Sequence, residues 1–280
     1  MIRRERGYLA YRDDVDNQAS RQLQNEGYAV IRGVFSNAEL KTLRSEVNSV
    51  YDRYSPDGRG PFPTQWSNFR YEMLNRSAAC QTAVANRGIL DAIEPLLGED
   101  CHVIANTAWR NPPDKSYQHG GAGWHIDAGP HVPLGPGMEW PEDIPHPVFA
   151  IGAHIYLKTC RLKDGPTGVI PRSHLSGLSP PKDQTTDDDL SWRGHKTVPL
   201  LARAGDVAMF VSDVWHRRLP CLPGNQGRFF LQAHYGRRDI AQRLRTTDDT
   251  HQLSPAAIAR LDSDRARTVA GIHPRFFYDG

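Results

Sequence analysis

The chain has 280 residues, of which 39% are hydrophobic and 24% charged, so it can bury a full core and is not expected to be disordered. Its 34 basic and 32 acidic residues give a net charge of +2, which leaves no excess of positive charge for a nucleic-acid backbone. The composition therefore disfavours nucleic acid as a partner.

The N-terminus and the cysteines bear on the compartment. No apolar run approaches the thickness of a bilayer, and no apolar segment follows the charged residues 1–6, so neither a membrane span nor a secretory signal is expected. The cysteines are far apart and lack C-x-x-C spacing, which predicts reduced thiols. We expect a cytoplasmic protein without a membrane partner. The four cysteines are Cys80, Cys101, Cys160 and Cys221.

The first 100 residues are predicted to be mostly helical with one core strand. Ser36 and Glu39 form a capping box, in which each side chain satisfies a backbone amide of the first helical turn. Apolar residues then recur at helical spacing from Leu40 to Val50 and predict a stripe that packs on a sheet. The expected elements are a helical stretch at 15–26, a buried strand at 28–34, a helix from residue 36, a loop at 52–68 and a helical region at 79–97 that ends near Gly98.

The pattern changes beyond residue 100, where short apolar runs alternate with Gly, Pro and Asp clusters. This spacing is typical of a closed barrel or a double-sheet β architecture. We expect one domain over residues 1–280, with the β core at 101–240 and a C-terminal extension at 241–280. Strands are predicted at 102–109, 148–157, 168–170, 198–201, 207–211 and 229–235.

Two predicted connections are long for such a fold. One spans 128–147 and contains six prolines and Trp140, and the other spans 175–196 and contains an acidic run at 187–189. Long ordered loops on a rigid scaffold are often lids or binding loops, although plain surface insertions are equally common. Trp140 is a candidate lid residue.

A His-x-Asp motif is the first sign of a metal site. His125 and Asp127 are two residues apart, and positions i and i+2 of an extended strand project to the same face. Both could therefore bind one metal ion. The motif alone is weak evidence, because the chain contains twelve histidines.

A later histidine strengthens the motif. A predicted turn and strand at 204–210 lead to His216, which a barrel of antiparallel strands could bring to His125 and Asp127. Two imidazoles and one carboxylate then form a facial triad, whose remaining positions stay open. Such a site suits Fe(II), because the open positions accept a bidentate oxoacid and dioxygen, whereas a closed four-ligand zinc site does not.

Arg228, twelve residues beyond His216, fits an oxoacid. A guanidinium offers a planar fork that matches a carboxylate, and a buried arginine needs an anionic partner. A structural ion pair is the alternative interpretation of this arginine.

These residues together resemble the phytanoyl-CoA dioxygenase family of Fe(II)/2-oxoglutarate-dependent oxygenases, from about residue 27 to 235. The resemblance implies a mainly β protein with flanking helices and a double-stranded β-helix, that is a jelly-roll or cupin-like core. The matching motifs are His125-x-Asp127, the turn at 164–168, the stretch 169–174, Gly205-Asp206, His216 and Arg228.

The resemblance also implies roles for single residues. His125, Asp127 and His216 would bind iron, and Arg228 would bind the far carboxylate of 2-oxoglutarate. Thr167 would also contact this co-substrate, as in some relatives; the alternative is that its hydroxyl binds nearby backbone in the turn. Relatives that transfer halide have a small residue in place of the carboxylate, so Asp127 favours oxygen transfer.

Two positions depart from the family pattern. Relatives often have a glycine where Arg172 stands, a change that we expect to have no effect. Relatives often have a glutamine shortly before the His-x-Asp motif, where this chain has Gly121-Ala122-Gly123. Asn106, Arg110 or Gln118 is a candidate to replace its contact with the oxoacid.

The predicted function is that of an Fe(II)/2-oxoglutarate-dependent dioxygenase that uses O2 to hydroxylate an unactivated C–H bond of a small-molecule metabolite, releasing succinate and CO2. Two alternatives stay open: a redox-inert metal-dependent hydrolase, with His119 or His131 as general base, and a non-catalytic jelly-roll binding protein. The sequence does not choose a substrate, an oligomeric state, or between hydroxylation and desaturation, cyclisation or epoxidation.

Overall fold

The structure is a computed structural model of the chain. It describes residues 17–54, 69–113, 123–127, 129–135, 137–138, 140–141, 143–242, 244 and 251–272, together with the backbone of two short N-terminal strands, β1 (Arg3–Glu5) and β2 (Tyr8–Ala10). β1 and β2 pair with each other in an antiparallel hairpin.

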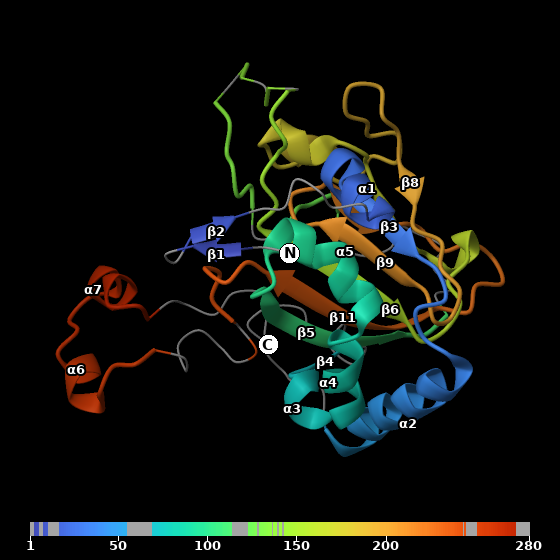
Figure 1. The fold of residues 1–280 in the computed structure, drawn as a ribbon, viewed down its shortest axis with the longest axis horizontal. Coiled ribbons are helices and arrows are strands. Elements are labelled where there is room, and N and C mark those ends of the chain that lie inside the picture. Colours follow the sequence, from blue (N-terminus) through green and yellow to red (C-terminus); the bar gives the residue numbers. More distant parts are fainter. Residues whose placement is uncertain are drawn as a thin grey trace.

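A large antiparallel sheet forms the centre of the molecule (Figure 1). Its strands run in the order β3, β9, β6, β11, β5, β4, so strands distant in sequence lie side by side. β11 is central, because it pairs with both β6 and β5 over most of its length. The strands are β3 (Tyr28–Ile31), β4 (Phe69–Tyr71), β5 (His102–Asn111), β6 (Ala150–Tyr156), β9 (Val207–Val211) and β11 (Arg228–Gly236).

Helices cover one face of this sheet. Leu231, Ala233 and Tyr235 of β11 join the apolar sides of the helices in the main hydrophobic core. In Figure 1, α5 lies directly in front of the strands. The helices are α1 (Gln18–Glu26), α2 (Asn37–Arg53), α3 (Met73–Arg76), α4 (Ala78–Val84) and α5 (Arg87–Leu97).

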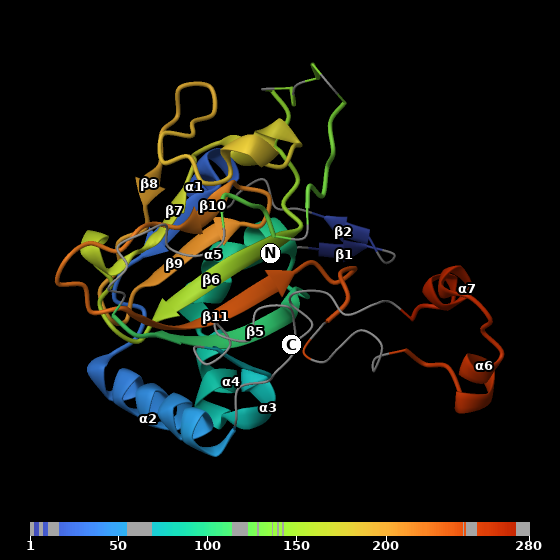
Figure 2. The same cartoon turned by 180° about the vertical axis from the view of Figure 1, so that it is seen from behind.

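A small sheet covers the opposite face. It consists of β10 (His216–Arg218), β7 (Thr167–Val169) and β8 (Val198–Pro199), in that order, and lies in front of the large sheet in Figure 2. Val169 of the small sheet shares a buried apolar cluster with Phe210 and Phe230 of the large one. The two facing antiparallel sheets are the expected double-stranded β-helix, and the space between them receives every second side chain of each strand.

The predicted strands are confirmed, because each apolar run coincides with β3, β5, β6, β7, β8, β9 or β11. Two strands of the large and small sheets were not predicted, nor was the hairpin of β1 and β2. β4 and β10 have only three residues each, and β10 reads His-Arg-Arg, which lacks the apolar pattern of a buried strand.

The region at 79–97 is helical as predicted, but it is not one continuous helical region. The chain forms α4 and α5 instead, separated near Ala85, because Asn86 accepts a hydrogen bond from the Gly88 amide and caps a new helix. The capping box of Ser36 and Glu39 at the start of α2 is confirmed. The helix predicted from residue 15 is described from Gln18, after its N-cap Asn17.

The C-terminal part carries two short helices, α6 (Pro255–Ala259) and α7 (Asp264–Val269), which lie to one side of the sheets in both views (Figures 1 and 2). Over the described part of the chain, no helix combines the length and apolar character needed to cross a bilayer. All four cysteines are free thiols, as predicted.

Candidate metal centre

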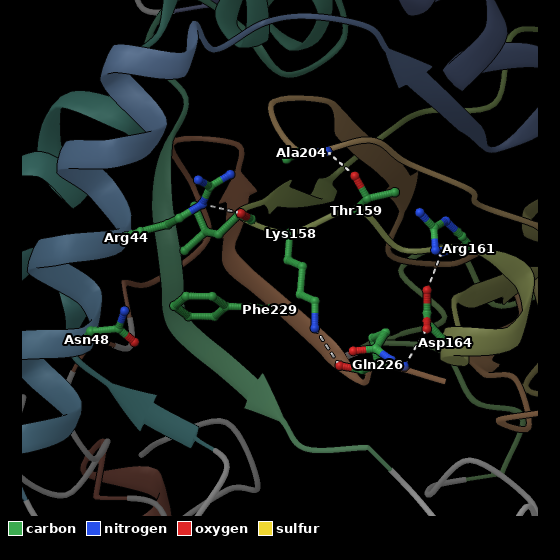
Figure 3. A pocket seen from close by; sticks show the side chains of 10 residues that line it. Arg44, Asn48, Lys158, Thr159, Arg161, Asp164, Ala204, Gln226 and Phe229 are labelled. Carbon is green, nitrogen blue, oxygen red and sulfur yellow. Dashed lines mark hydrogen bonds between the residues drawn. The ribbon is translucent and has the colours of Figure 1, made fainter. Parts of the chain in front are cut away.

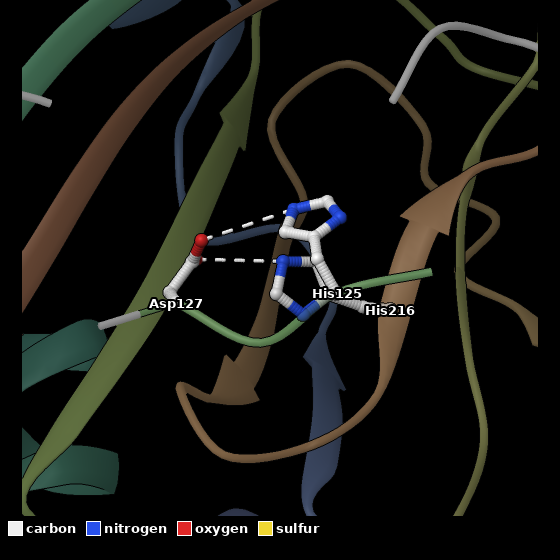
Figure 4. A group of neighbouring side chains, drawn as sticks. All are labelled: His125, Asp127 and His216. Carbon is white, nitrogen blue, oxygen red and sulfur yellow. Dashed lines mark ion pairs between the residues drawn. The ribbon is translucent and has the colours of Figure 1, made fainter. Parts of the chain in front are cut away.

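The structure brings His125, Asp127 and His216 together (Figure 4). One potential ligand atom of each lies within 4.8 Å of the other two, and this is the one such group of three among the described residues. His216 is the first residue of β10, and His125 forms an antiparallel bridge with it through two 3.0 Å backbone hydrogen bonds. The Asp127 amide is anchored to the Ser212 carbonyl at 2.9 Å.

The expected extended strand around the His-x-Asp motif needs correction. Only the isolated bridge at His125 is β structure, and the chain bends at Asp127. The two side chains still converge, because the bridge fixes His125 and the Ser212 carbonyl fixes the Asp127 backbone. Tertiary contacts therefore replace the strand periodicity that the prediction used.

Backbone carbonyls select the tautomer of both histidines. Nδ1 of His125 lies 2.7 Å from the Gly123 carbonyl, and Nδ1 of His216 lies 2.9 Å from the Val214 carbonyl. A carbonyl only accepts, so each Nδ1 carries a proton, and in the neutral ring Nε2 is the atom with a free lone pair. Both Nε2 atoms face Asp127, at 3.9 Å from Oδ1 for His125 and 3.4 Å from Oδ2 for His216. Such second contacts orient metal-binding histidines.

The charge states at neutral pH also suit a divalent cation. Burial and the neighbouring His216 lower the pKa of His125 to about 4, so its ring is neutral. Burial alone would raise the pKa of Asp127, but His216 and His234 hold it well below its usual range. A neutral imidazole and an ionised carboxylate are the forms that bind a metal.

Arg228 lies in the space between the sheets, as predicted. It is the first residue of β11 and is 5% exposed. Its one hydrogen bond to a described residue runs from Nε to Oδ1 of Asn111, 3.3 Å away, and no described carboxylate pairs with it. Burial and the nearby Arg218 lower its pKa to about 10, which leaves the guanidinium charged at neutral pH. The structural ion pair considered above is therefore not found among the described residues.

Thr167 of β7 faces the same space. It lies opposite Arg218 on β10, and its hydroxyl is 3.4 Å from Nδ1 of His154. The Tyr156 hydroxyl lies beside Thr167 and within electrostatic reach of Arg228. Burial raises the pKa of Tyr156 well above its usual range, so the phenol stays protonated and can donate a hydrogen bond.

Asn106 does not join the site, contrary to the expectation. It pairs across β5 and β11 with Ala233, whose side chain belongs to the helix-covered core. Directly opposed residues share a face, so Asn106 points away from the metal group. Its amide donates to the Gln232 carbonyl at 2.8 Å.

Of the other two candidates for contact with the oxoacid, Arg110 and Gln118, the structure describes only Arg110. Arg110 lies on the helix side, where its guanidinium stacks on the Tyr51 ring and donates to Asn48. Gln118 lies outside the described residues, as does His119, one of the two histidines considered as a general base. The second, His131, is 2.8 Å from Oδ1 of Asp213 and is not part of the metal group.

Two histidines near the metal group, His154 and His234, were not predicted from the sequence. Both project between the sheets, because His154 pairs across strands with Gln232 and His234 with Gly152. Nε2 of His234 lies 2.9 Å from Oδ2 of Asp127. The spacing Arg228, Phe230, Gln232, His234 on one strand face was the available signal, once the strand itself had been predicted.

Two pockets of the described surface lie away from this site. The larger, of about 510 Å³, is lined by residues that include Arg44, Lys158, Arg161 and Phe229 (Figure 3). Phe229 packs against the helix-covered core, on the strand face opposite to Arg228. A second pocket, of about 340 Å³, lies beside the end of α1 and the loop at 140–146. No residue of the metal group lines either pocket.

Comparison with known protein families identifies the family to which the chain belongs. Residues 23–218 match the model of the phytanoyl-CoA dioxygenase family, a range that contains the three residues of the metal group and Thr167. The chain belongs to the phytanoyl-CoA dioxygenase family. As a member of that family it is a 2-oxoglutarate-dependent non-haem iron oxygenase. The match ends before Arg228, so the family model itself does not cover this arginine.

Solved structures of similar fold include two with a metal ion and 2-oxoglutarate bound and one described as alpha ketoglutarate dependent. HygX from Streptomyces hygroscopicus, solved with nickel and 2-oxoglutarate bound, superposes with a TM-score of 0.57 at 14% identity, over 79% of this chain and 86% of HygX. The epimerase SnoN, in complex with Fe3+, alpha ketoglutarate and nogalamycin RO, gives 0.58 at 15% identity over 79% and 82%. The carbocyclase SnoK from nogalamycin biosynthesis gives 0.58 at 16% identity over 82% and 87%. No curated protein matched the chain.

Proposed function

We propose that this phytanoyl-CoA dioxygenase family member holds one Fe(II) ion with His125, Asp127 and His216, binds 2-oxoglutarate through Arg228, and hydroxylates an unactivated C–H bond of a small-molecule metabolite. The geometry of the three ligand atoms carries the proposal, because both histidines are locked with Nε2 facing the carboxylate. A ferrous ion with 2-oxoglutarate and dioxygen supplies an oxidant for such a bond, with succinate and CO2 as the other products.

The residues fit the ion and its co-substrate on separate grounds. Two imidazoles and one carboxylate on one side leave open coordination positions, which is typical of Fe(II) oxygenases. Arg228 is a buried cation with no described acidic partner, so an anion of the ligand would compensate its charge. The Tyr156 phenol and the Thr167 hydroxyl lie beside it and would donate to the same carboxylate.

The protein's remaining contribution is orientation and shielding. Phe210 contacts the His154 ring edge-on, and Phe230 packs against the same ring at a tilt. With Tyr156 they give the space between the sheets an apolar lining. Such a lining excludes water, which strengthens the attraction between Arg228 and a carboxylate. A small-molecule substrate is supported by HygX solved with hygromycin B and SnoN solved with nogalamycin RO, since both structures share this fold.

The test is oxoacid turnover by purified protein. With Fe(II), ascorbate, oxygen and 2-oxoglutarate, we expect succinate above the metal-free control, even without the true substrate, and more of it when the substrate is present. Anaerobic calorimetry should show that 2-oxoglutarate binds only to the metal-loaded protein. If neither binding nor succinate is detected, the oxygenase proposal fails and the metal-dependent hydrolase takes its place.

A further inference from the structure

His234 lies in direct contact with the carboxylate that we assign to the metal. Its Nε2 is 2.9 Å from Oδ2 of Asp127, and the side chains are only 6% and 5% exposed. His234 is not within ligand distance of the whole metal group, which contains His125, Asp127 and His216 alone. The contact is therefore with a ligand and not with the position that the ligands surround.

The proton of His234 is placed by its strand neighbour. Nε2 of the Gln232 amide lies 3.3 Å from Nδ1 of His234. An amide nitrogen only donates, so Nδ1 of the ring accepts and the proton of a neutral imidazole sits on Nε2. Nε2, which then carries the proton, lies 2.9 Å from Oδ2 of Asp127, within hydrogen-bond distance of the carboxylate.

The neighbouring strand provides room for this ring. Gly152 of β6 lies directly opposite His234, and a Cβ atom there would be 2.9 Å from Nε2 of His234 and 2.8 Å from Cζ of Phe210. Both distances are shorter than side chains tolerate, and Phe210 is almost fully buried. A larger residue at position 152 would therefore push against both the imidazole and the Phe210 ring.

We propose that His234 is a positioning residue, which donates a hydrogen bond to Oδ2 of Asp127 and so turns Oδ1 of that carboxylate to the metal. The inference rests on the proposed function, since it assigns Asp127 to iron. A carboxylate that binds through one oxygen needs a donor on the other to fix its rotation. His234 supplies this donor from β11, the strand that also begins with Arg228.

The experiment compares binding of Co(II), as the probe metal, to the full chain and its variants by calorimetry and by the visible absorption of the bound ion. His234→Leu removes the donor and keeps an apolar side chain, and should weaken binding by about 10–100-fold. His234→Gln restores a donor at this position and should bind more tightly than His234→Leu. Gly152→Ala keeps the histidine but displaces it, and should also weaken binding.

His174→Leu is the matched control, because His174 is an equally buried histidine whose Nε2 contacts the Gln24 carbonyl and not the metal group. It should leave the dissociation constant for Co(II) unchanged.

Each other outcome has a distinct meaning. Unchanged affinity in both His234→Leu and Gly152→Ala overturns the positioning role while leaving the proposed function intact. A loss in His234→Gln as large as that in His216→Ala, with a changed absorption spectrum, shows His234 to be a metal ligand and also overturns it. Failure of the unmodified protein to bind Co(II) overturns the proposed function and this inference together.

Discussion

At the scale of single residues, the site depends on which side-chain atoms already form hydrogen bonds within the protein. The Gly123 and Val214 carbonyls occupy Nδ1 of His125 and His216, so Nε2 remains for the metal. Arg228 differs from these histidines, because most of its donors are left without a described partner and its charge is buried. The metal and the oxoacid should therefore respond to different substitutions.

Arg228→Ala tests this separation. Removing one partner of a buried charge pair costs about 2–5 kcal/mol, so the dissociation constant for 2-oxoglutarate should rise by roughly 30-fold or more. Binding of the metal should change little, because Arg228 contacts none of the metal group. His216→Ala should weaken the metal itself. Calorimetry with Co(II), and then with 2-oxoglutarate, measures both constants, and equal loss of metal in the two variants would contradict the assigned roles.

At the scale of elements, the site is assembled from segments held by loops. The 3-10 turn η3 (Ser173–Ser176) docks on α1, where Nε2 of His174 meets the Gln24 carbonyl at 3.1 Å. The loop that follows η3 returns to the metal group, because the Trp124 amide donates to the Thr185 carbonyl at 2.7 Å. Asp188 of the same loop pairs with the buried Arg217 of β10. The segment at 175–196 is therefore tied to both segments that carry the metal-binding histidines.

The docking of η3 should make stability depend on pH. Burial lowers the pKa of His174 to about 4, below the 6.5 of an exposed histidine. Between pH 6.5 and 4 the unfolded chain binds this proton and the folded chain does not, so the free energy of unfolding falls as the pH falls. The contribution is at most about 3 kcal/mol. Urea unfolding from pH 7 to 4 should show a smaller decline for His174→Leu, and parallel curves would rule this contribution out.

The ion pair of the loop can be tested with a neighbouring control. Asp188→Asn leaves the Arg217 guanidinium buried without its carboxylate, and should lower the free energy of unfolding by about 1–3 kcal/mol, between the values of exposed and buried pairs. It should also speed proteolytic cleavage within 178–196. Asp189→Asn alters a carboxylate without a described ion pair and should change neither. Identical stability of the two variants would show that the pair contributes nothing.

At the scale of the whole molecule, the metal ligands come from two segments that meet at the β10 edge of the small sheet. His125 and Asp127 precede β6, whereas His216 begins β10, so the ion would join parts of the chain about ninety residues apart. Such a group forms only in the folded protein, and its ligand should stabilise the fold by mass action.

Metal binding should therefore raise the melting temperature. At a free metal concentration of 100 times the dissociation constant, the native state gains about 2.7 kcal/mol, which corresponds to an increase of roughly 5 °C or more for a chain of this size. A further increase is expected with 2-oxoglutarate, and a chelator should reverse both. Differential scanning fluorimetry measures the shifts. His216→Ala should show none, and a normal shift in that variant would exclude His216 as a ligand.

The sequence alone determined the elements with a clear period or cap. The apolar runs predicted seven of the strands, and the capping box predicted the start of α2, because both signals depend on residues close in sequence. The spacing of His125, Asp127 and His216, with the family resemblance, also predicted a metal site, and the structure brings these three side chains together.

Only the tertiary structure decided the contacts between distant segments. The register of β11 against β5 turned Asn106 to the helices, and the register of β11 against β6 placed His234 over Gly152 and beside Asp127. A shift of one residue would exchange the faces of either strand, and no local pattern in the sequence fixes that shift. The folded chain therefore added a positioning histidine to the predicted metal site and removed an asparagine from the predicted oxoacid site.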